Sequence, residues 1–327
     1  GMTDRTQTKA QRLGRISHLL HRNPHGLTVQ ELSRLCQVHK RTIQRDLRDL
    51  EGMGVPIWVD GKDPPRYGIT EGYYLPPIHL SLDDALALYL AGRLLARQAD
   101  PYTPQIVQAL AKLAGILPEA VARHVQDTVR EMASHRAARD LSEILSTLAL
   151  GWASGRVICI RYQAIGSENI HTYRMHPYFI EACGEYRGFY VIGWADYFED
   201  IHTFRVERIH EARLTEETFE IPEGFSGADL LSEAWGVMYG PEPQPVRLRF
   251  ADEAARRICE TQWHHSQALD TDGGGGCTLS LSVAHPEEML YWIRSWGPQV
   301  EVLEPQWLRE QVRDEALAMA QVYDRRN

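Results

Sequence analysis

The chain has 327 residues, of which 43% are apolar and 24% charged, and its 44 acidic residues outnumber its 35 lysines and arginines. This composition is typical of a globular protein of two or three domains and excludes a disordered chain. No run approaches the roughly 18 consecutive apolar residues that span a membrane, and the N-terminal stretch lacks the apolar core of a signal peptide. We therefore expect a cytoplasmic protein with no membrane partner.

The charge is divided unevenly along the chain. Residues 1–70 contain 12 Lys and Arg against 7 Asp and Glu, a balance of +5, which leaves −14 for residues 71–327. A basic segment attached to an acidic remainder indicates that a polyanion meets the N-terminal part.

The N-terminal segment predicts three short helices. In KAQRLGRISHLLHR the apolar residues recur at three- and four-residue spacing, which predicts a first helix that ends near Asn23. Thr28 and Glu31 fit a capping box at the start of a second helix. A third helix follows over about residues 39–52 and carries the stretch KRTIQRDLRD.

The third helix has two opposite faces. At about 100° of rotation per residue, three aliphatic residues share one side and three arginines lie roughly opposite, with Thr42 and Gln44 beside them. The aliphatic residues are Ile43, Leu47 and Leu50, and the arginines are Arg41, Arg45 and Arg48. Such a helix, held by two others, fits the major groove of B-DNA, where Arg and Gln reach base edges. The alternative is a solvated helix whose arginines form ion pairs with Asp46 and Asp49.

The stretch VPIWVDGKDPPRYGI predicts a β-hairpin, with a strand at 57–59, a tight polar turn and a second strand near 67–69. Its basic residues Lys62 and Arg66 would contact the sugar-phosphate backbone. Three helices followed by such a hairpin make a winged helix-turn-helix that binds double-stranded DNA. The DNA-binding candidates are Thr28, Lys40, Arg41, Thr42, Gln44, Arg45, Arg48, Lys62 and Arg66.

Residues 76–153 form a predicted helical linker without a catalytic pattern. Ser81 and Asp84 occupy capping positions of the helix that runs through DDALALYLAGRLLARQ, and two further helices are expected over about residues 104–135 and 139–153. Helices of this kind between two domains often form dimer contacts or transmit rotation, and both roles remain open here.

From Val157 the hydrophobic period changes to two. Five short alternating or apolar runs are separated by polar or glycine-containing turns, namely VICIRYQ, HTYRMHPYFI, YRGFYVIGWAD, IHTFRVERI and HEARLTEETF. About five strands at this spacing predict a small β-barrel.

The stretch RGFYVIGWADYFEDIHTFRVERI resembles the core motif of WYL-domain proteins. In this family of bacterial transcriptional regulators, a winged helix-turn-helix precedes an Sm-like barrel and a C-terminal extension. The stretch QVHKRTIQRDLRDLEGMGVPI resembles the family's recognition helix and its turn into the wing, and RYQAIGSENIHTYRMHPYFI resembles its first barrel strands. Where the family name calls for Trp, Tyr and Leu, this chain has Phe189, Tyr190 and Val191, and Phe lacks the indole N–H that a ligand would bind.

The resemblance implies that the barrel binds an effector, commonly a nucleotide or short nucleic acid, through basic and aromatic residues. The matching positions are Tyr162, Arg174, His176, Phe189, Tyr190, Arg205 and Arg208. These types suit the task, because guanidinium groups bind phosphate and aromatic rings stack on bases. Arg205 and Arg208 are an odd number apart, so both reach one site only if a bulge or turn separates them. The alternative is that both form ion pairs with neighbours such as Glu207.

The proline-rich stretch GPEPQPV at 240–246 marks a domain boundary. Beyond it, strands (VRLRF, CTLSLSV and VEVLEP) alternate with helices near 251–260 and 286–295 and a closing helix, which predicts a compact α+β unit. This unit resembles the C-terminal extension of WYL-domain proteins.

Two patterns that suggest a cofactor or metal carry neither. DGGGGC lacks the Lys-Ser or Lys-Thr of a phosphate-binding loop and leads into a strand, so we expect a hairpin turn. The residues His264, His265, Cys259 and Cys277 do not have the ligand spacing of a zinc site. The five cysteines form no C-x-x-C pair, and we expect reduced, mostly buried thiols.

The sequence thus predicts a multidomain α+β protein. Its expected parts are a winged helix-turn-helix domain at 1–75, a helical linker at 76–153, a WYL β-barrel that senses an effector at 154–239 and a C-terminal α+β extension at 240–327. We interpret it as a sequence-specific transcriptional regulator, not an enzyme, that binds DNA as a homodimer and senses an anionic ligand. The alternatives are a nucleotide- or nucleic-acid-processing enzyme, for which paired carboxylates and an activated nucleophile are lacking, and a ligand-independent DNA-binding module.

Overall fold

The chain divides into two compact units, which are described separately. The first contains residues 1–90 and 113–123, and the second contains residues 91–112 and 124–327. Among the residues that the structure describes, no helix is both long and apolar enough to cross a bilayer. The computed structural model describes residues 8–70, 80–98, 104–134, 141–271 and 273–324.

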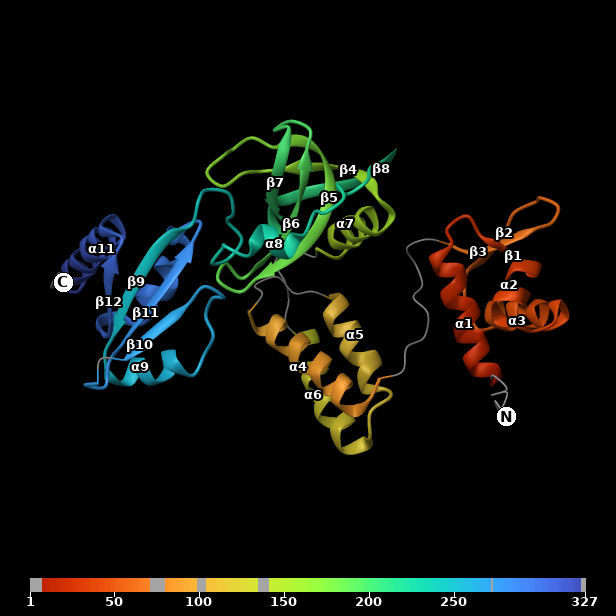
Figure 1. Cartoon of the computed structure of the whole chain (residues 1–327), viewed down its shortest axis with the longest axis horizontal. Helices are drawn as coiled ribbons and strands as arrows, with labels where there is room; N and C mark the ends of the chain where they lie inside the picture. The colour runs from red at the N-terminus through yellow and green to blue at the C-terminus, as the bar shows by residue number, and fades with distance from the viewer. Residues whose placement is uncertain (1–7, 71–79, 99–103, 135–140, 272, 325–327) are drawn as a thin grey trace. The chain divides into compact units, whose positions relative to one another are not determined.

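Three helices and a small sheet make up the N-terminal domain (Figure 1). The helices pack around a shared core that includes Ile16, Leu32 and Ile43, each fully buried. The sheet has the order β1-β3-β2 and is antiparallel, so the predicted hairpin is confirmed and gains a short third strand. The elements are α1 (Lys9–Arg22), β1 (Leu27–Thr28), α2 (Val29–Cys36), α3 (Lys40–Gly52), β2 (Ile57–Val59) and β3 (Arg66–Ile69).

Trp58 lies across Gly68 at the base of the hairpin. The two residues are directly opposite on β2 and β3, and the indole N–H donates to the carbonyl oxygen of Ile69 at 3.2 Å. A Cβ atom at position 68 would lie 2.2 Å from the indole ring. Only glycine therefore lets the ring cover β3 and fix the hairpin against the helices.

Four helices follow, and one of them differs from the prediction. The expected single helix over about 104–135 is wrong, because the chain forms two helices with a break at residues 115–118. Gly115 and Pro118 explain the break, since glycine favours leaving a helix and proline disfavours a helical conformation in the residue before it. The helices are α4 (Leu82–Gln98), α5 (Pro104–Ala114), α6 (Glu119–Ser134) and α7 (Ser142–Ser154).

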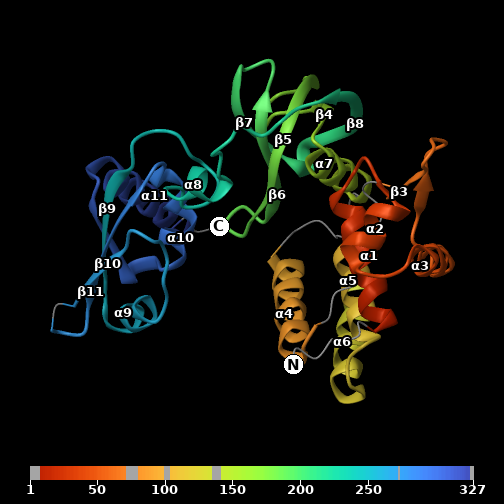
Figure 2. The same ribbon diagram turned by 45° about the vertical axis from the view of Figure 1, so that its right-hand side comes forward.

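The middle domain is a five-stranded antiparallel sheet with the order β7-β6-β5-β4-β8. The five predicted strands are confirmed, and α7 packs against β4, β5 and β8 (Figures 1 and 2). Its core includes Ile160, Met175 and Phe204, each at most 1% exposed. The strands are β4 (Arg156–Tyr162), β5 (His171–Cys183), β6 (Gly188–Ala195), β7 (Asp200–Arg205) and β8 (Ile209–Thr218).

The C-terminal domain has a four-stranded antiparallel sheet with the order β10-β11-β9-β12. Its core contains Phe250, Trp292 and Leu308, and the predicted strands and helices are confirmed. Strand β10 was not predicted, because all four of its residues are exposed and show no apolar alternation. The elements are β9 (Gln244–Phe250), α9 (Asp252–Cys259), β10 (Ala268–Thr271), β11 (Cys277–Val283), α10 (Leu290–Ser295), β12 (Val300–Glu304) and α11 (Gln306–Asp324).

Residues 232–239, called the strap here, connect the middle sheet to the C-terminal domain after the short helix α8 (Gly227–Leu231). The carboxylate of Glu288 is 1% exposed and accepts the backbone N–H groups of Gly236, Val237 and Met238 at 2.9, 3.0 and 3.1 Å. Val237 packs in turn with Cys183 and Tyr190 of the middle sheet. One buried carboxylate thus fixes the conformation of the strap.

Candidate nucleic-acid interface

Helix α3 is anchored by one apolar face. Ile43, Leu47 and Leu50 are at most 3% exposed and lie in the N-terminal core with residues of α1 and α2. The helix begins after His39, whose side chain makes no capping hydrogen bond. The first turn of α3 therefore presents backbone N–H groups without a side-chain cap.

The opposite face of α3 is basic and exposed. Arg41, Gln44, Arg45 and Arg48 all lie in the solvent-accessible class, and Thr42 is half-buried beside them. Within this face, Nε of Arg48 donates to the backbone carbonyl oxygen of Gln44 at 3.2 Å. The predicted division of the helix into an aliphatic and a guanidinium face is confirmed.

The two acidic residues of α3 turn toward α1 instead of pairing with these arginines. Asp46 binds Arg12, with O–N distances of 2.5 and 3.1 Å, and this contact raises the pKa of the Arg12 guanidinium. Asp49 binds the Lys9 ammonium at 2.8 Å, which lowers the pKa of its carboxyl. In the part of the chain that the structure describes, the three arginines of α3 consequently have no ion-pair partner, and the solvated-helix alternative loses its expected contacts.

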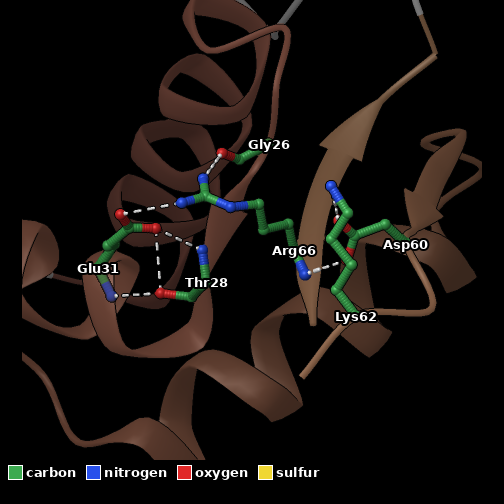
Figure 3. A network of polar contacts seen from close by, with 6 residues as sticks. All are labelled: Gly26, Thr28, Glu31, Asp60, Lys62 and Arg66. Carbon is green, nitrogen blue, oxygen red and sulfur yellow. Dashed lines mark hydrogen bonds and ion pairs between the residues drawn. The ribbon is translucent and has the colours of Figure 1, made fainter. Parts of the chain in front are cut away.

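Thr28, one of the DNA-binding candidates, is committed to capping α2 (Figure 3). It is 8% exposed, and its hydroxyl accepts the N–H of Glu31 at 3.2 Å while its own N–H donates to the Glu31 carboxylate at 2.7 Å. The hydrogen bond from the Thr28 backbone lowers the pKa of Glu31. This reciprocal arrangement is the predicted capping box.

Arg66 points back into the domain, as Figure 3 shows. Its Nη1 donates to the carbonyl oxygen of Gly26 at 2.7 Å, and its Nη2 lies 3.7 Å from the Glu31 carboxylate. Lys62, at the tip of the hairpin, has an 80% exposed side chain that lies 3.9 Å from Asp60. Of the two wing cations, Lys62 is therefore the one placed to meet a phosphate.

A hollow of about 750 Å³ opens between the end of α2 and the start of α3. It is lined by Arg34, Gln37 and His39, which the sequence did not single out, together with Lys40 and Arg41. Lys40 also donates to the side-chain oxygen of Gln30 at 3.2 Å. The signal available in the sequence was the position of these residues in the turn that leads into the basic helix.

The candidate effector residues of the middle sheet fall into separate groups. Arg174 contacts Asp196 and Glu217, and His176 lies 3.3 Å from Asp196. Tyr162 and Phe189 are 8% and 7% exposed and belong to the core of the sheet. The remaining candidates gather around one phenol and are Tyr190, Arg205 and Arg208.

Tyr190 and Arg205 are cross-strand neighbours on β6 and β7. The guanidinium carbon of Arg205 lies 5.9 Å from the centre of the Tyr190 ring, while Nε binds Glu207 at 3.1 Å and Nη2 donates to the carbonyl oxygen of Tyr186 at 3.0 Å. Burial raises the pKa of Tyr190 to about 12, against the opposing effect of the charges on Arg205 and Arg208.

A turn separates Arg205 from Arg208. Residues Val206–Arg208 form a single 3₁₀ turn between β7 and β8, so the alternation of a regular strand does not apply to them. Both guanidinium groups act electrostatically on the Tyr190 phenol. The ion pair between Arg205 and Glu207 is also present, so one feature from each of the two sequence interpretations occurs.

Three family models match successive segments of the chain. An HTH domain matches residues 12–62, a WYL domain matches residues 143–214 and a WCX domain matches residues 242–320. The chain belongs to the WYL-domain transcriptional regulators. The HTH match covers α1, α2 and α3, and the WYL match covers Tyr190 and the 3₁₀ turn after Arg205.

Relatives of this WYL-domain regulator align over nearly its whole length. Protein PafC of Mycobacterium tuberculosis is 24% identical over 326 residues, which cover 97% of the chain and 96% of PafC. The HTH-type transcriptional regulator YobV of Bacillus subtilis is 20% identical over 298 residues, which cover 90% of the chain and 93% of YobV.

Two solved structures were also found for this WYL-domain regulator. Proteasome accessory factor B/C of Arthrobacter aurescens is 20% identical with a TM-score of 0.30, and the match covers 98% of the chain. The chain spans about half of that protein, 48% of its length. A CRISPR Cas-related protein is 10% identical with a TM-score of 0.41, and the match covers 77% of the chain and 88% of that protein.

Proposed function

We propose that this WYL-domain regulator recognises a specific DNA sequence by placing α3 in the major groove, and that it acts by binding rather than by catalysis. The HTH and WYL domains make it a DNA-binding transcriptional regulator. The finer assignment rests on one observation, the exposed guanidinium face of α3. Arg and Gln side chains reach the hydrogen-bonding edges of bases from a helix in this groove.

The ion pairs of the acidic residues support this proposal. Because Asp46 and Asp49 bind α1, they hold the helix in place and leave Arg41, Arg45 and Arg48 free of partners among the described residues. A guanidinium without a protein partner loses less when it leaves water for a base edge or a phosphate. Lys62 and the residues of the hollow beside α3 then supply contacts to the phosphates on either side.

The test is a binding titration with a DNA site selected from a random library by the full-length protein. Arg45→Ala and Arg48→Ala should each weaken binding by about 1–3 kcal/mol and relax the preference at one base position. Arg313→Ala, which removes an exposed arginine of α11, is the matched control and should change neither affinity nor preference. Unchanged affinity and salt dependence in both α3 variants would show that another surface binds the DNA.

The WYL domain is proposed to bind an anionic effector, a nucleotide or a short nucleic acid, beside Tyr190. Two guanidinium groups and a phenol meet there, and Glu207 already holds Arg205 in the geometry that a phosphate oxygen would require. A bound phosphate would compete with that carboxylate and could bind both arginines, because the 3₁₀ turn sets them on one side. The sequence-specific contacts of α3 would then respond to ligand binding in the second unit.

A thermal-shift screen of nucleotides and short single strands tests the effector site, since a ligand that binds only the folded form raises the apparent stability. Arg208→Ala should abolish the shift caused by any ligand found in the screen. Arg213→Ala is the control, because Arg213 is exposed on β8 and bound to Glu211. A shift that survives Arg208→Ala and disappears in Arg213→Ala would move the site to the β4–β8 surface.

A regulator of this kind is expected to act as a homodimer, with two copies of α3 on one operator. Dimeric helix-turn-helix proteins read two half-sites about one helical turn of DNA apart. Footprinting of the selected site should therefore protect two related half-sites. A single protected half-site at saturation would indicate a monomer.

A further inference from the structure

Helix α4 carries an uncovered aliphatic face. Leu86, Leu90 and Leu94 are 43%, 55% and 57% exposed, whereas Ala85 and Tyr89 on the other side of the helix are 3% and 6% exposed. These three leucines follow each other at four-residue spacing, so they form one stripe along the helix. A stripe of this kind on a helix marks a surface that another helix covers.

Small residues accompany the stripe. Ala87 and Ala91 follow the first two leucines and, at about 100° per residue, lie on the same outward side. Both are exposed. Alternation of large and small side chains allows two helices to approach closely, because a leucine of one helix fits over an alanine of the other.

The stripe ends in opposite charges. Asp83 precedes it and Arg97 follows it, and rotation of about 100° per residue places both side chains in the same sector as the leucines. Both are exposed, and neither has an ion-pair partner among the described residues. The neighbouring acid Asp84 is occupied instead, because it forms the capping box with Ser81. The neighbouring base Arg93 is also occupied, because it binds Glu131 at 2.8 Å.

The face is symmetric about Leu90. Asp83 and Arg97 are equally far from it in sequence, and so are Leu86 and Leu94. When two such helices pack antiparallel with Leu90 opposite Leu90, each Asp83 meets the Arg97 of the other copy, and each Leu86 meets a Leu94. The charges repel in the parallel arrangement, where Asp83 faces Asp83. The face is therefore complementary to an inverted copy of itself.

We propose that α4 is a homodimer contact, in which two copies of the chain pair antiparallel through this face about a two-fold axis at Leu90. The proposal deepens the proposed function, in which two copies act on one operator. With 17 residues at about 1.5 Å each, the helix is about 25 Å long, so the contact is small for a permanent interface. We therefore expect a reversible dimer whose population rises with protein concentration.

The first test is sedimentation velocity of the full-length chain over a concentration series. The wild type should show a monomer–dimer equilibrium, and Leu90→Glu should remove the dimer, because it places two carboxylates opposite each other on the axis. Leu88→Glu is the matched control: Leu88 is 52% exposed on the same helix but points about 160° away from Leu90. A wild type that stays monomeric at every concentration, or a dimer that Leu90→Glu leaves intact, overturns the proposal.

The second test reads the antiparallel register. Asp83→Arg and Arg97→Asp should each lose the dimer, since each creates two like-charged contacts. The double variant should regain it, and an equimolar mixture of the two single variants should form a heterodimer in which both contacts are attractive. Failure of the mixture to associate, with the folds intact by circular dichroism, overturns the pairing.

The outcome is separable from that of the proposed function. The base preference of α3 is read from Arg45→Ala and Arg48→Ala, which lie outside α4. If the charge-swap results fail while those variants still alter base preference, the regulator assignment stands and only the α4 contact is wrong. If base preference is unaffected while the swap succeeds, the reverse holds.

Discussion

Asp46 lies fully buried beneath α3 and binds Arg12 of α1 through two hydrogen bonds, from Nε at 2.5 Å and from Nη2 at 3.1 Å. Both side chains are nearly inaccessible, with 10% of the Arg12 side chain and none of the Asp46 side chain exposed. The pair therefore fixes the orientation of α3 relative to α1, and with it the direction of the guanidinium face.

Removal of one partner of this pair should be strongly destabilising. Asp46→Asn leaves the Arg12 charge buried without its counterion, which typically costs about 3–5 kcal/mol. The measurement is hydrogen–deuterium exchange of peptides from α1 and α3 in the full-length chain, where both should lose protection. The double variant Arg12→Met with Asp46→Leu is the control and should retain more protection than either single variant, because no charge remains buried.

The hairpin should depend on the absence of a side chain at Gly68. Gly68→Ala places a Cβ 2.2 Å from the indole of Trp58, so the ring must leave β3, at a cost of about 1–3 kcal/mol for an overpacked site. The displaced hairpin should weaken DNA binding and reduce its salt dependence, because Lys62 moves with it. Gly61→Ala, whose Cβ meets nothing within 4 Å, is the control, and equal effects of the two changes would contradict this explanation.

Acid should weaken the N-terminal domain through Glu31. Its pKa is lowered in the folded state, chiefly by the hydrogen bond from the Thr28 backbone N–H and further by the charge of Arg66. Its contribution to stability is therefore complete above its unfolded-state pKa of 4.5, and it is lost as the pH falls through the lower folded-state value. Chemical unfolding of wild type and Glu31→Gln should give a stability difference that narrows below this pKa, and a constant difference would remove Glu31 as the cause.

The strap should loosen when its anchor is removed. Glu288→Ala leaves three buried N–H groups without an acceptor, each at a cost of about 1–3 kcal/mol unless water replaces the carboxylate. We expect faster hydrogen exchange at Gly236, Val237 and Met238. Glu287→Gln changes an adjacent, half-exposed carboxylate that binds His285 and should leave the exchange of the strap unchanged.

Patterns local in sequence predicted most of the fold. The two faces of α3 follow from the spacing of Ile43 and Leu47, and the hairpin follows from its polar turn between short apolar runs, so both were found. The break at Pro118 was present in the sequence but was overridden by apolar periodicity on either side. Strand β10 carries no alternation, because its partner β11 alone orders it.

The site was less predictable wherever a contact joins distant residues. Arg66 has the composition of a phosphate contact, yet Gly26 and Glu31 bind it from 40 and 35 positions away. Asp46 has the spacing of a helix ion pair, yet Arg12 lies 34 residues upstream. Sequence spacing gives the face on which a side chain lies but not the partner that the tertiary fold brings to it.

The anchoring of the strap limits how this protein can be recombined. Three consecutive amides near residue 237 take their conformation from a carboxylate some 50 positions downstream, and Val237 of the same segment seals Tyr190. A chimera that joins this WYL domain to the C-terminal domain of a relative would lack a matched acceptor at position 288. The two domains should therefore be exchanged as one cassette.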